Sequence, residues 1–288
     1  MSGQGGRAGM NTVFDRLAPE HFHQAPFDHF AIEEALPADD FAALAESFPS
    51  LEYVAGGGAL ENNRPYLKGA SEVLADAQLP APWRAFFEAH TAPERFAQIV
   101  ALWGDAIRRV HPGIEDNFGK PLEAFSVGLR APGKWESDAN RQHDVVLDCL
   151  FGVNSPVQTP TPARGPHVDS PAKLFSALLY LRDPEDDCEG GAFELYAPQG
   201  RLYPKRQYKK IPDHKVSRVK QVPYRANTLV GWLNGARAIH AVEPRSVTPR
   251  PRRYIAITAE CYGGKEKRGH FLHDPSWSSL TGRLRNLF

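Results

Sequence analysis

The residues of this chain most able to do chemistry are a histidine and an aspartate two positions apart, His167 and Asp169, in the stretch RGPHVDSPAKLF. In an extended chain, residues i and i+2 point to the same face, so the imidazole and the carboxylate can reach one point. A metal site needs a third ligand, and a later, otherwise apolar segment of strand composition supplies His240. Two histidines and one carboxylate on one face of a metal ion leave coordination positions open for reactants.

Each part of this pattern also has an ordinary structural explanation. About half a His-x-Asp match is expected by chance in a chain of this composition. A single histidine in a strand is more often a core or surface residue than a ligand, and the segment Asp169-Ser170-Pro171 is typical of a turn. The order of the pieces favours the metal site, because HxD is followed by a strand, a glycine pair, a distal histidine and an arginine in a strand.

Composition limits the class of protein. With 288 residues, of which 42% are hydrophobic, the chain can bury a large core. Lys plus Arg equals Asp plus Glu at 34 each, which argues against a nucleic-acid coat or a membrane-surface protein. Three widely spaced cysteines and the lack of an apolar leader or membrane-length run predict a soluble, cytoplasmic protein.

The hydrophobic pattern and the residue composition of the chain change at about residue 121. Before it, the apolar spacing predicts amphipathic helices over 37–50 and 91–113, and the turn-rich stretch 56–67 predicts a surface loop. After it, short runs of strand composition are separated by Pro, Gly and Asp, without an intervening helical pattern, and should pair antiparallel. These runs cover 122–133, 144–156, 173–184, 190–198, 227–235, 237–244 and 252–260. They favour a sandwich, barrel or jelly roll with the helices against one face.

Between about residues 121 and 260 the chain resembles the Fe(II)- and 2-oxoglutarate-dependent oxygenases, in particular their prolyl-hydroxylase-like branch. The resemblance rests on GPHVDSPAKLFSALLYLRDPEDDCEGGAFELY, NTLVGWLNGARAIHAVEP and RRYIAITAE, which keep these motifs in the family's order. It implies an α+β, mainly β fold: a double-stranded β-helix (a cupin-like jelly roll) core with N-terminal helices packed against it. We expect a flexible N-terminus, residues 1–14, followed by one oxygenase domain, residues 15–288. Within this domain, residues 15–120 would form a helical support region, 121–262 the double-stranded β-helix core and 263–288 a C-terminal extension.

The resemblance also implies the chemistry. His167, Asp169 and His240 would bind Fe(II) as the catalytic centre, with 2-oxoglutarate and O2 as co-substrates and ascorbate as an optional reductant. Oxidative decarboxylation of 2-oxoglutarate to succinate and CO2 would drive hydroxylation of the substrate. Related halogenases have a small residue at the position of Asp169, where chloride binds, so the carboxylate kept here favours hydroxylation.

In this family a basic residue after the distal histidine pairs with the far carboxylate of 2-oxoglutarate. Arg253 directly precedes the apolar run YIAI and is assigned this role, because a guanidinium can bind a carboxylate through two hydrogen bonds. Arg250 has the more typical spacing from the histidine and stays the alternative. Tyr180, on the strand after HxD, is a further expected contact of 2-oxoglutarate.

The substrate is indicated only by charge. Residues 201–225 contain nine Lys or Arg and one acidic residue, Asp213, and predict either a solvated basic hairpin or a region that attracts an anionic substrate. Trp135, Arg141 and Arg164 are the expected substrate contacts. A small or medium-sized anionic metabolite is therefore the expected substrate.

Alternatives from other classes remain at this point. The enzyme could hydroxylate or demethylate a protein or a nucleic acid, although nothing in the sequence resembles a nucleic-acid-binding motif. A non-catalytic, cupin-like metal-binding module could carry the same ligands, but a plain metal site does not need the strand arginine. No membrane partner is expected, and the sequence leaves the oligomeric state open, with a homodimer among the options.

Overall fold

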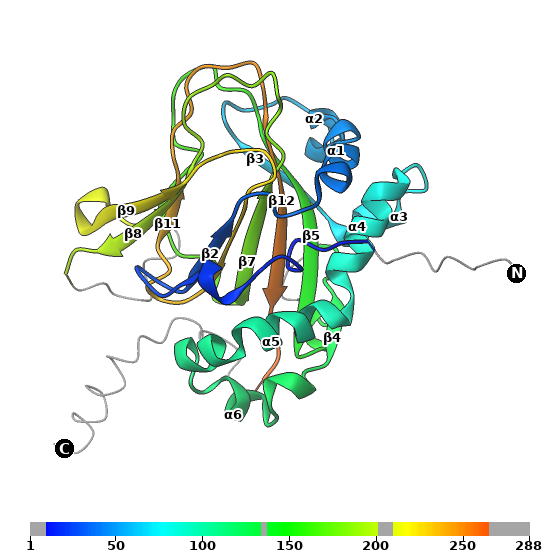
Figure 1. The fold of residues 1–288 in the computed structure, drawn as a ribbon, viewed down its shortest axis with the longest axis vertical. Coiled ribbons are helices and arrows are strands. Elements are labelled where there is room, and N and C mark those ends of the chain that lie inside the picture. The colour runs from blue at the N-terminus through cyan, green and yellow to red at the C-terminus, as the bar shows by residue number, and fades with distance from the viewer. Residues whose placement is uncertain (1–9, 134–136, 201–209, 265–288) are drawn as a thin grey trace, which may run out of the picture.

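The computed structural model describes residues 10–133, 137–200 and 210–264, and its core is formed by two β-sheets (Figure 1). In these residues the larger sheet has the order β1-β2-β10-β7-β12-β5-β3, with β4 beside β5, and the smaller has the order β6-β11-β8-β9. The larger sheet contains β1 (Phe22–His23), β2 (His29–Ile32), β3 (Pro65–Gly69), β4 (Val127–Leu129), β5 (Val145–Asn154), β7 (Lys173–Tyr180), β10 (Leu229–Leu233) and β12 (Arg252–Glu260). The smaller sheet contains β6 (Arg164–His167), β8 (Phe193–Pro198), β9 (Val216–Val222) and β11 (His240–Val242). This is the predicted mainly β, jelly-roll fold.

All pairings in the two sheets are antiparallel except that of β4 with β5, which is parallel. The region expected to be helical, 15–120, also supplies three strands to the larger sheet. One of them, β3, begins inside the stretch 56–67 that was predicted to be a surface loop. Its pairing with β5 satisfies backbone hydrogen-bonding groups along an edge that would otherwise be open. The local sequence did not predict this strand, because it is short, lies beside turn residues and depends on a distant partner.

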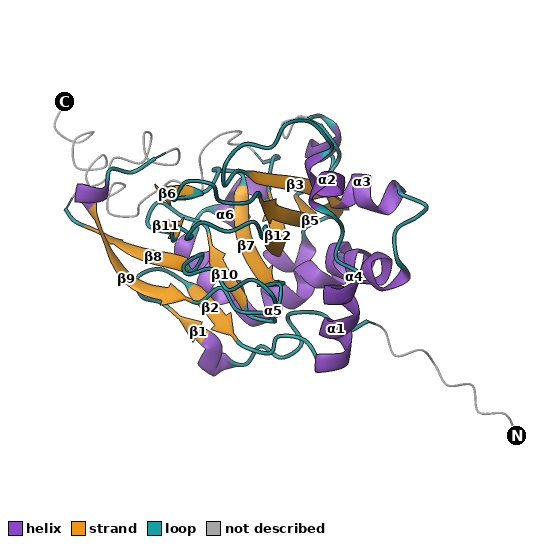
Figure 2. Cartoon of the chain, turned by 90° about the horizontal axis from the view of Figure 1, so that it is seen from above, coloured by secondary structure: helices purple, strands orange, loops and turns teal. Residues whose placement is uncertain are grey.

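Helices cover one face of the larger sheet (Figure 2). The predicted helix 91–113 corresponds to α5, whose buried stripe includes Phe96, Val100, Trp103 and Ile107. The predicted helix 37–50 corresponds to α1, and a separate helix, α2, follows it. The helices are α1 (Ala38–Glu46), α2 (Leu51–Ala55), α3 (Ala70–Ala75), α4 (Ala81–Thr91), α5 (Pro93–Val110) and α6 (Ile114–Phe118). None of the helices in the described ranges has the length and apolar composition needed to cross a membrane.

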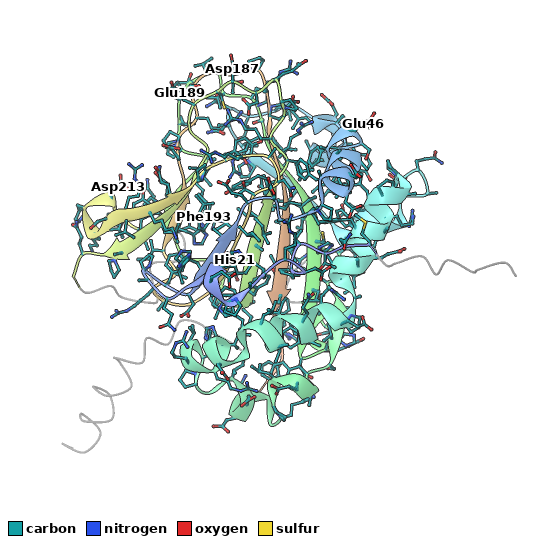
Figure 3. The ribbon with its side chains drawn as sticks, in the orientation of Figure 1. His21, Glu46, Asp187, Glu189, Phe193 and Asp213 are labelled. Carbon is teal, nitrogen blue, oxygen red and sulfur yellow. The ribbon has the colours of Figure 1, made fainter. Side chains whose placement is uncertain are left out.

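Side chains alternate between the two faces of each strand, so the larger sheet contributes to two separate hydrophobic cores. On β5, the odd-numbered residues from Val145 to Val153 pack with the helices in the larger apolar cluster. A second cluster contains Phe193 of the smaller sheet, which is labelled in Figure 3. It joins Phe193 to Tyr180, Trp232 and Tyr254 of the larger sheet. We call the face of the larger sheet that carries this second cluster the concave face; it is the face turned toward β6 and β11.

Candidate active site

Two of the predicted ligands lie on neighbouring strands of the smaller sheet. His167 ends β6 and His240 begins β11, and the two residues are paired across the strands with ring centroids 4.2 Å apart. Asp169 follows β6, and its Oδ1 lies 3.7 Å from Nε2 of His167 and 3.9 Å from Nε2 of His240. We call these three residues the triad. The structure thus brings together residues that are more than 70 positions apart in the sequence.

Backbone carbonyls hold both imidazoles in one tautomer. Nδ1 of His167 lies 2.9 Å from the carbonyl oxygen of Gly165, and Nδ1 of His240 lies 2.9 Å from that of Ala238. Each Nδ1 must therefore carry the proton and donate it, which leaves a lone pair on Nε2, facing Asp169. Burial lowers the pKa of both histidines, that of His240 to about 3, so neutral imidazoles are favoured.

Three polar side chains contact Asp169. Ser176 on β7 donates a hydrogen bond from Oγ to Oδ2 at 3.2 Å. Nζ of Lys173 lies 3.6 Å from Oδ2, and Nη1 of Arg164 lies 3.9 Å from Oδ1. Burial alone would raise the pKa of Asp169, but neighbouring positive charge, with that of Lys173 first, outweighs it and holds the pKa well below its usual range. The carboxylate is therefore ionised and ready to bind a cation.

The donor set fits a divalent metal ion. The ligand atoms of the triad all lie within 4.8 Å of one another, and the three side chains are buried. Two neutral imidazole nitrogens and one carboxylate oxygen on a single side are the ligand set of non-haem Fe(II) oxygenases, in which the other positions stay open.

A buried arginine lies on the concave face, at the start of β12. Arg252 is 1% exposed, and its guanidinium carbon lies 4.8 Å from the ring centroid of Tyr180, 4.9 Å from that of Tyr224 and 5.1 Å from that of Tyr254. Its Nε donates to the carbonyl oxygen of Gly191 at 3.0 Å. Its Nη2 and the hydroxyl of Tyr180 are both buried without a hydrogen-bond partner of good geometry. A bound carboxylate would satisfy both groups, because such orphaned donors are costly when nothing pairs with them.

The two arginines predicted for this role lie elsewhere. Arg253 follows Arg252 in the strand and therefore points to the opposite face, where it donates from Nε to the carbonyl oxygen of Leu181 and packs over Phe48. Arg250 is half-exposed and pairs with Glu185. Neither guanidinium reaches the concave face, whereas Tyr180, the third predicted contact, does.

Sequence comparison identifies the chain. Residues 159–258, which include the triad and Arg252, match the family model of the 2OG-Fe(II) oxygenase superfamily. This part of the chain is a 2OG-Fe(II) oxygenase domain. The chain is accordingly an enzyme whose cofactors are Fe(II) and 2-oxoglutarate and which uses O2.

Solved structures similar to this oxygenase include prolyl 4-hydroxylases and an enzyme from nogalamycin biosynthesis. A prolyl-4-hydroxylase of Pseudomonas putida is 16% identical, covers 81% of this chain and 92% of its own, and has a TM-score of 0.42. A prolyl 4-hydroxylase from Phytophthora capsici is 13% identical, with 90% and 68% covered and a TM-score of 0.45. The α-ketoglutarate-dependent carbocyclase SnoK from nogalamycin biosynthesis is 15% identical, with 94% of each chain covered and a TM-score of 0.47. No curated protein sequence matches the oxygenase.

The predicted substrate contacts of the oxygenase have different locations. Arg164 lies beside the triad, as given above, whereas Arg141 is exposed and lies 3.9 Å from Asp138, with no contact to the triad. Trp135 falls outside the described residues, as do 201–209 of the basic segment. In the part of that segment that is described, Arg218 donates to Glu194 at 2.7 Å. The local positive charge of the segment is therefore partly neutralised.

Several residues around the triad were not predicted from the sequence. Ser176, Trp232 and Arg252 lie on strands of the larger sheet whose parity places them on the concave face. Phe193 lies on the smaller sheet, and Lys173 is the first residue of β7. The ring of Phe193 stacks on His240 at 5.2 Å between centroids, and the ring of Trp232 lies at 4.6 Å. The sequence did contain a signal for Arg252: it is two residues before Tyr254 on one predicted strand, so the two side chains must lie on the same face.

A cluster of charged side chains lies on the concave face at the end of β12 opposite to Arg252. Asp148 on β5 accepts a hydrogen bond from the backbone nitrogen of Ala70 at 3.0 Å, and Arg130 lies 3.7 Å from its Oδ2. Arg130 also donates from Nε to Glu260 at 3.1 Å. Burial is the main reason that the pKa of Asp148 is raised, to about 7, and Glu260 adds to the rise. Asp148 therefore holds its proton at pH values at which an exposed aspartate has lost it.

This raised pKa predicts a pH-dependent stability. The stabilisation from the protonated group is full below the unfolded pKa, about 4, and is lost as the pH rises through about 7. Asp148→Asn removes this dependence, so the free energy of unfolding of the wild type should fall relative to the variant, by up to about 1.4 kcal/mol per pH unit. Urea unfolding of both proteins at pH 5, 6 and 7 measures the difference. Parallel pH profiles of the two proteins would contradict the raised pKa.

Proposed function

We propose that this oxygenase is a hydroxylase that binds Fe(II) through His167, Asp169 and His240 and hydroxylates a small or medium-sized metabolite. The observation that carries the proposal is the convergence of two Nε2 atoms and one carboxylate oxygen within 4.8 Å, buried between the sheets. When bound, Fe(II) and 2-oxoglutarate supply oxidative chemistry with release of succinate and CO2. The carboxylate of Asp169 supports hydroxylation rather than halogenation, because it fills the position that a chloride would need.

Each residue of the site has a role that follows from its contacts. The carbonyl oxygens of Gly165 and Ala238 orient the imidazoles so that Nε2 can bind a metal. Ser176 holds the second carboxylate oxygen of Asp169 through its hydroxyl. These contacts fix the three ligands before the metal arrives, which reduces the entropy lost on binding.

We assign the far carboxylate of 2-oxoglutarate to Arg252 and Tyr180 in place of Arg253 or Arg250. Nη2 of Arg252 and the hydroxyl of Tyr180 are buried donors without a hydrogen-bond partner, as is Nε1 of Trp232 on the same face. Of these donors, the guanidinium is the one that can pair with a carboxylate through two parallel hydrogen bonds. The low polarity around the tyrosine rings strengthens a charge-assisted hydrogen bond made there.

The first test is an anaerobic titration of the purified apoprotein with Fe(II) and then with 2-oxoglutarate. A weak visible charge-transfer band is expected when 2-oxoglutarate chelates the metal, and oxygen should then release succinate. A folded protein that shows neither the band nor succinate would contradict the proposed function and favour a metal-binding module without catalysis.

A further inference from the structure

Two basic side chains contact the carboxylate that the proposed function gives to the metal. Arg164 begins β6 and Lys173 begins β7, and both approach Asp169, at 3.9 Å and 3.6 Å respectively. The side chain of Arg164 is 51% exposed and that of Lys173 is 27% exposed. The triad is therefore bordered by two cations that a ligand from solution can reach.

The two cations share one carboxylate. Among the described residues, Asp169 is the acidic group paired with both Arg164 and Lys173, so one positive charge lacks a counter-ion. Fe(II) and 2-oxoglutarate carry equal and opposite charges, so binding them together would not supply the missing negative charge. An anion beside the metal would supply it.

The other acidic residues nearby already have partners of their own. Glu260 and Asp148 share Arg130. Glu260 is paired across the strands with Lys173, but its carboxylate also accepts a hydrogen bond from Tyr262. Glu194 lies on β8 and accepts hydrogen bonds from Arg218 and Gln221. Among the described residues, none of these carboxylates is therefore positioned to replace Asp169 as the partner of the two cations.

We propose that Arg164 and Lys173 bind an anionic group of the small-molecule substrate, a carboxylate or a phosphate, beside the metal. The inference rests on the proposed function and adds to it the chemical class of the substrate. Arginine suits this task because its planar guanidinium can donate two parallel hydrogen bonds to such a group, and lysine adds a second positive charge. Lys173 thereby gains a specificity role in addition to its contact with Asp169.

The test uses a paramagnetic metal as a distance probe. The full-length protein is loaded with Mn(II) and 2-oxoglutarate without oxygen, and inorganic phosphate or ¹³C-labelled acetate is titrated in. Nuclear relaxation of ³¹P or ¹³C should increase saturably, because the bound anion lies close to Mn(II). Arg164→Gln and Lys173→Gln should each weaken this binding by about tenfold, since each removes a charge-assisted contact.

Arg225→Gln is the matched control. Arg225 is 63% exposed and pairs with Glu33 at 3.0 Å, with no contact to the triad, so its replacement should leave anion binding unchanged. Enhancement with phosphate alone or with acetate alone supports the proposal and names the group. Equal relaxation in the wild type and both variants overturns it.

Titration of Mn(II) and 2-oxoglutarate in the same samples separates two kinds of failure. A wild-type protein that binds neither contradicts the proposed function. A wild-type protein that binds both, but shows no saturable anion effect, overturns the inference alone. Loss of 2-oxoglutarate rather than of the added anion in Arg164→Gln or Lys173→Gln would also overturn it, because these residues would then bind the cofactor.

Discussion

Replacement of His240 by alanine should reduce Fe(II)-dependent formation of succinate by about 100-fold or more. Loss of a metal ligand should reduce activity at least as much as loss of a residue that only orients a metal ligand. His240 is fixed by the carbonyl oxygen of Ala238 and presents Nε2 to Asp169, so no nearby residue of the triad can take its place. Succinate formation and equilibrium binding of Mn(II), followed by electron paramagnetic resonance, measure the two effects.

His143→Ala is the control for this experiment. The ring of His143 packs over Gly128 on β4, outside the metal-ligating group. Its replacement should leave Mn(II) binding within about threefold of the wild type, a difference of less than about 1 kcal/mol. Near-wild-type metal binding and turnover in His240→Ala would show that the triad is not the metal site.

Replacement of Arg252 by glutamine should raise the dissociation constant of 2-oxoglutarate by about 100-fold, the typical consequence of removing one partner of a buried charged hydrogen bond. The guanidinium lies among three tyrosine rings, with Nη2 unsatisfied beside the hydroxyl of Tyr180. Binding to Mn(II)-loaded protein without oxygen isolates this effect from catalysis.

The neighbouring arginine provides a matched control for Arg252. Arg253→Gln removes a similar side chain on the same strand, but one that contacts Asp183 and the carbonyl oxygen of Leu181 on the other face. It should change 2-oxoglutarate affinity by less than about threefold. A large loss of affinity in Arg253→Gln with little change in Arg252→Gln would restore the assignment made from the sequence. Circular dichroism and urea unfolding show whether either variant has lost its fold.

The local sequence was sufficient to name the three candidate metal ligands, because their residue types and local patterns are short-range signals. His167 and Asp169 are two residues apart, so an extended backbone directs both toward one side. The distal histidine was recognisable as a polar residue in an apolar, strand-like segment. Two further local signals agree with the structure. They are the strand-like composition after residue 121 and the long amphipathic pattern that corresponds to α5.

The 2-oxoglutarate contact and the edges of the larger sheet required the tertiary structure. Arg252 and Arg253 are adjacent and chemically identical, and only the pairing of β12 with β5 and β7 decides which of them faces the triad. A shift of one residue in that pairing would exchange their faces. The N-terminal strand β3 also depends on a distant partner, because its backbone groups are satisfied by β5. The sequence by itself determined which side chains could bind iron and in which order they occur; strand register, set by packing between distant segments, decided which arginine faces the site.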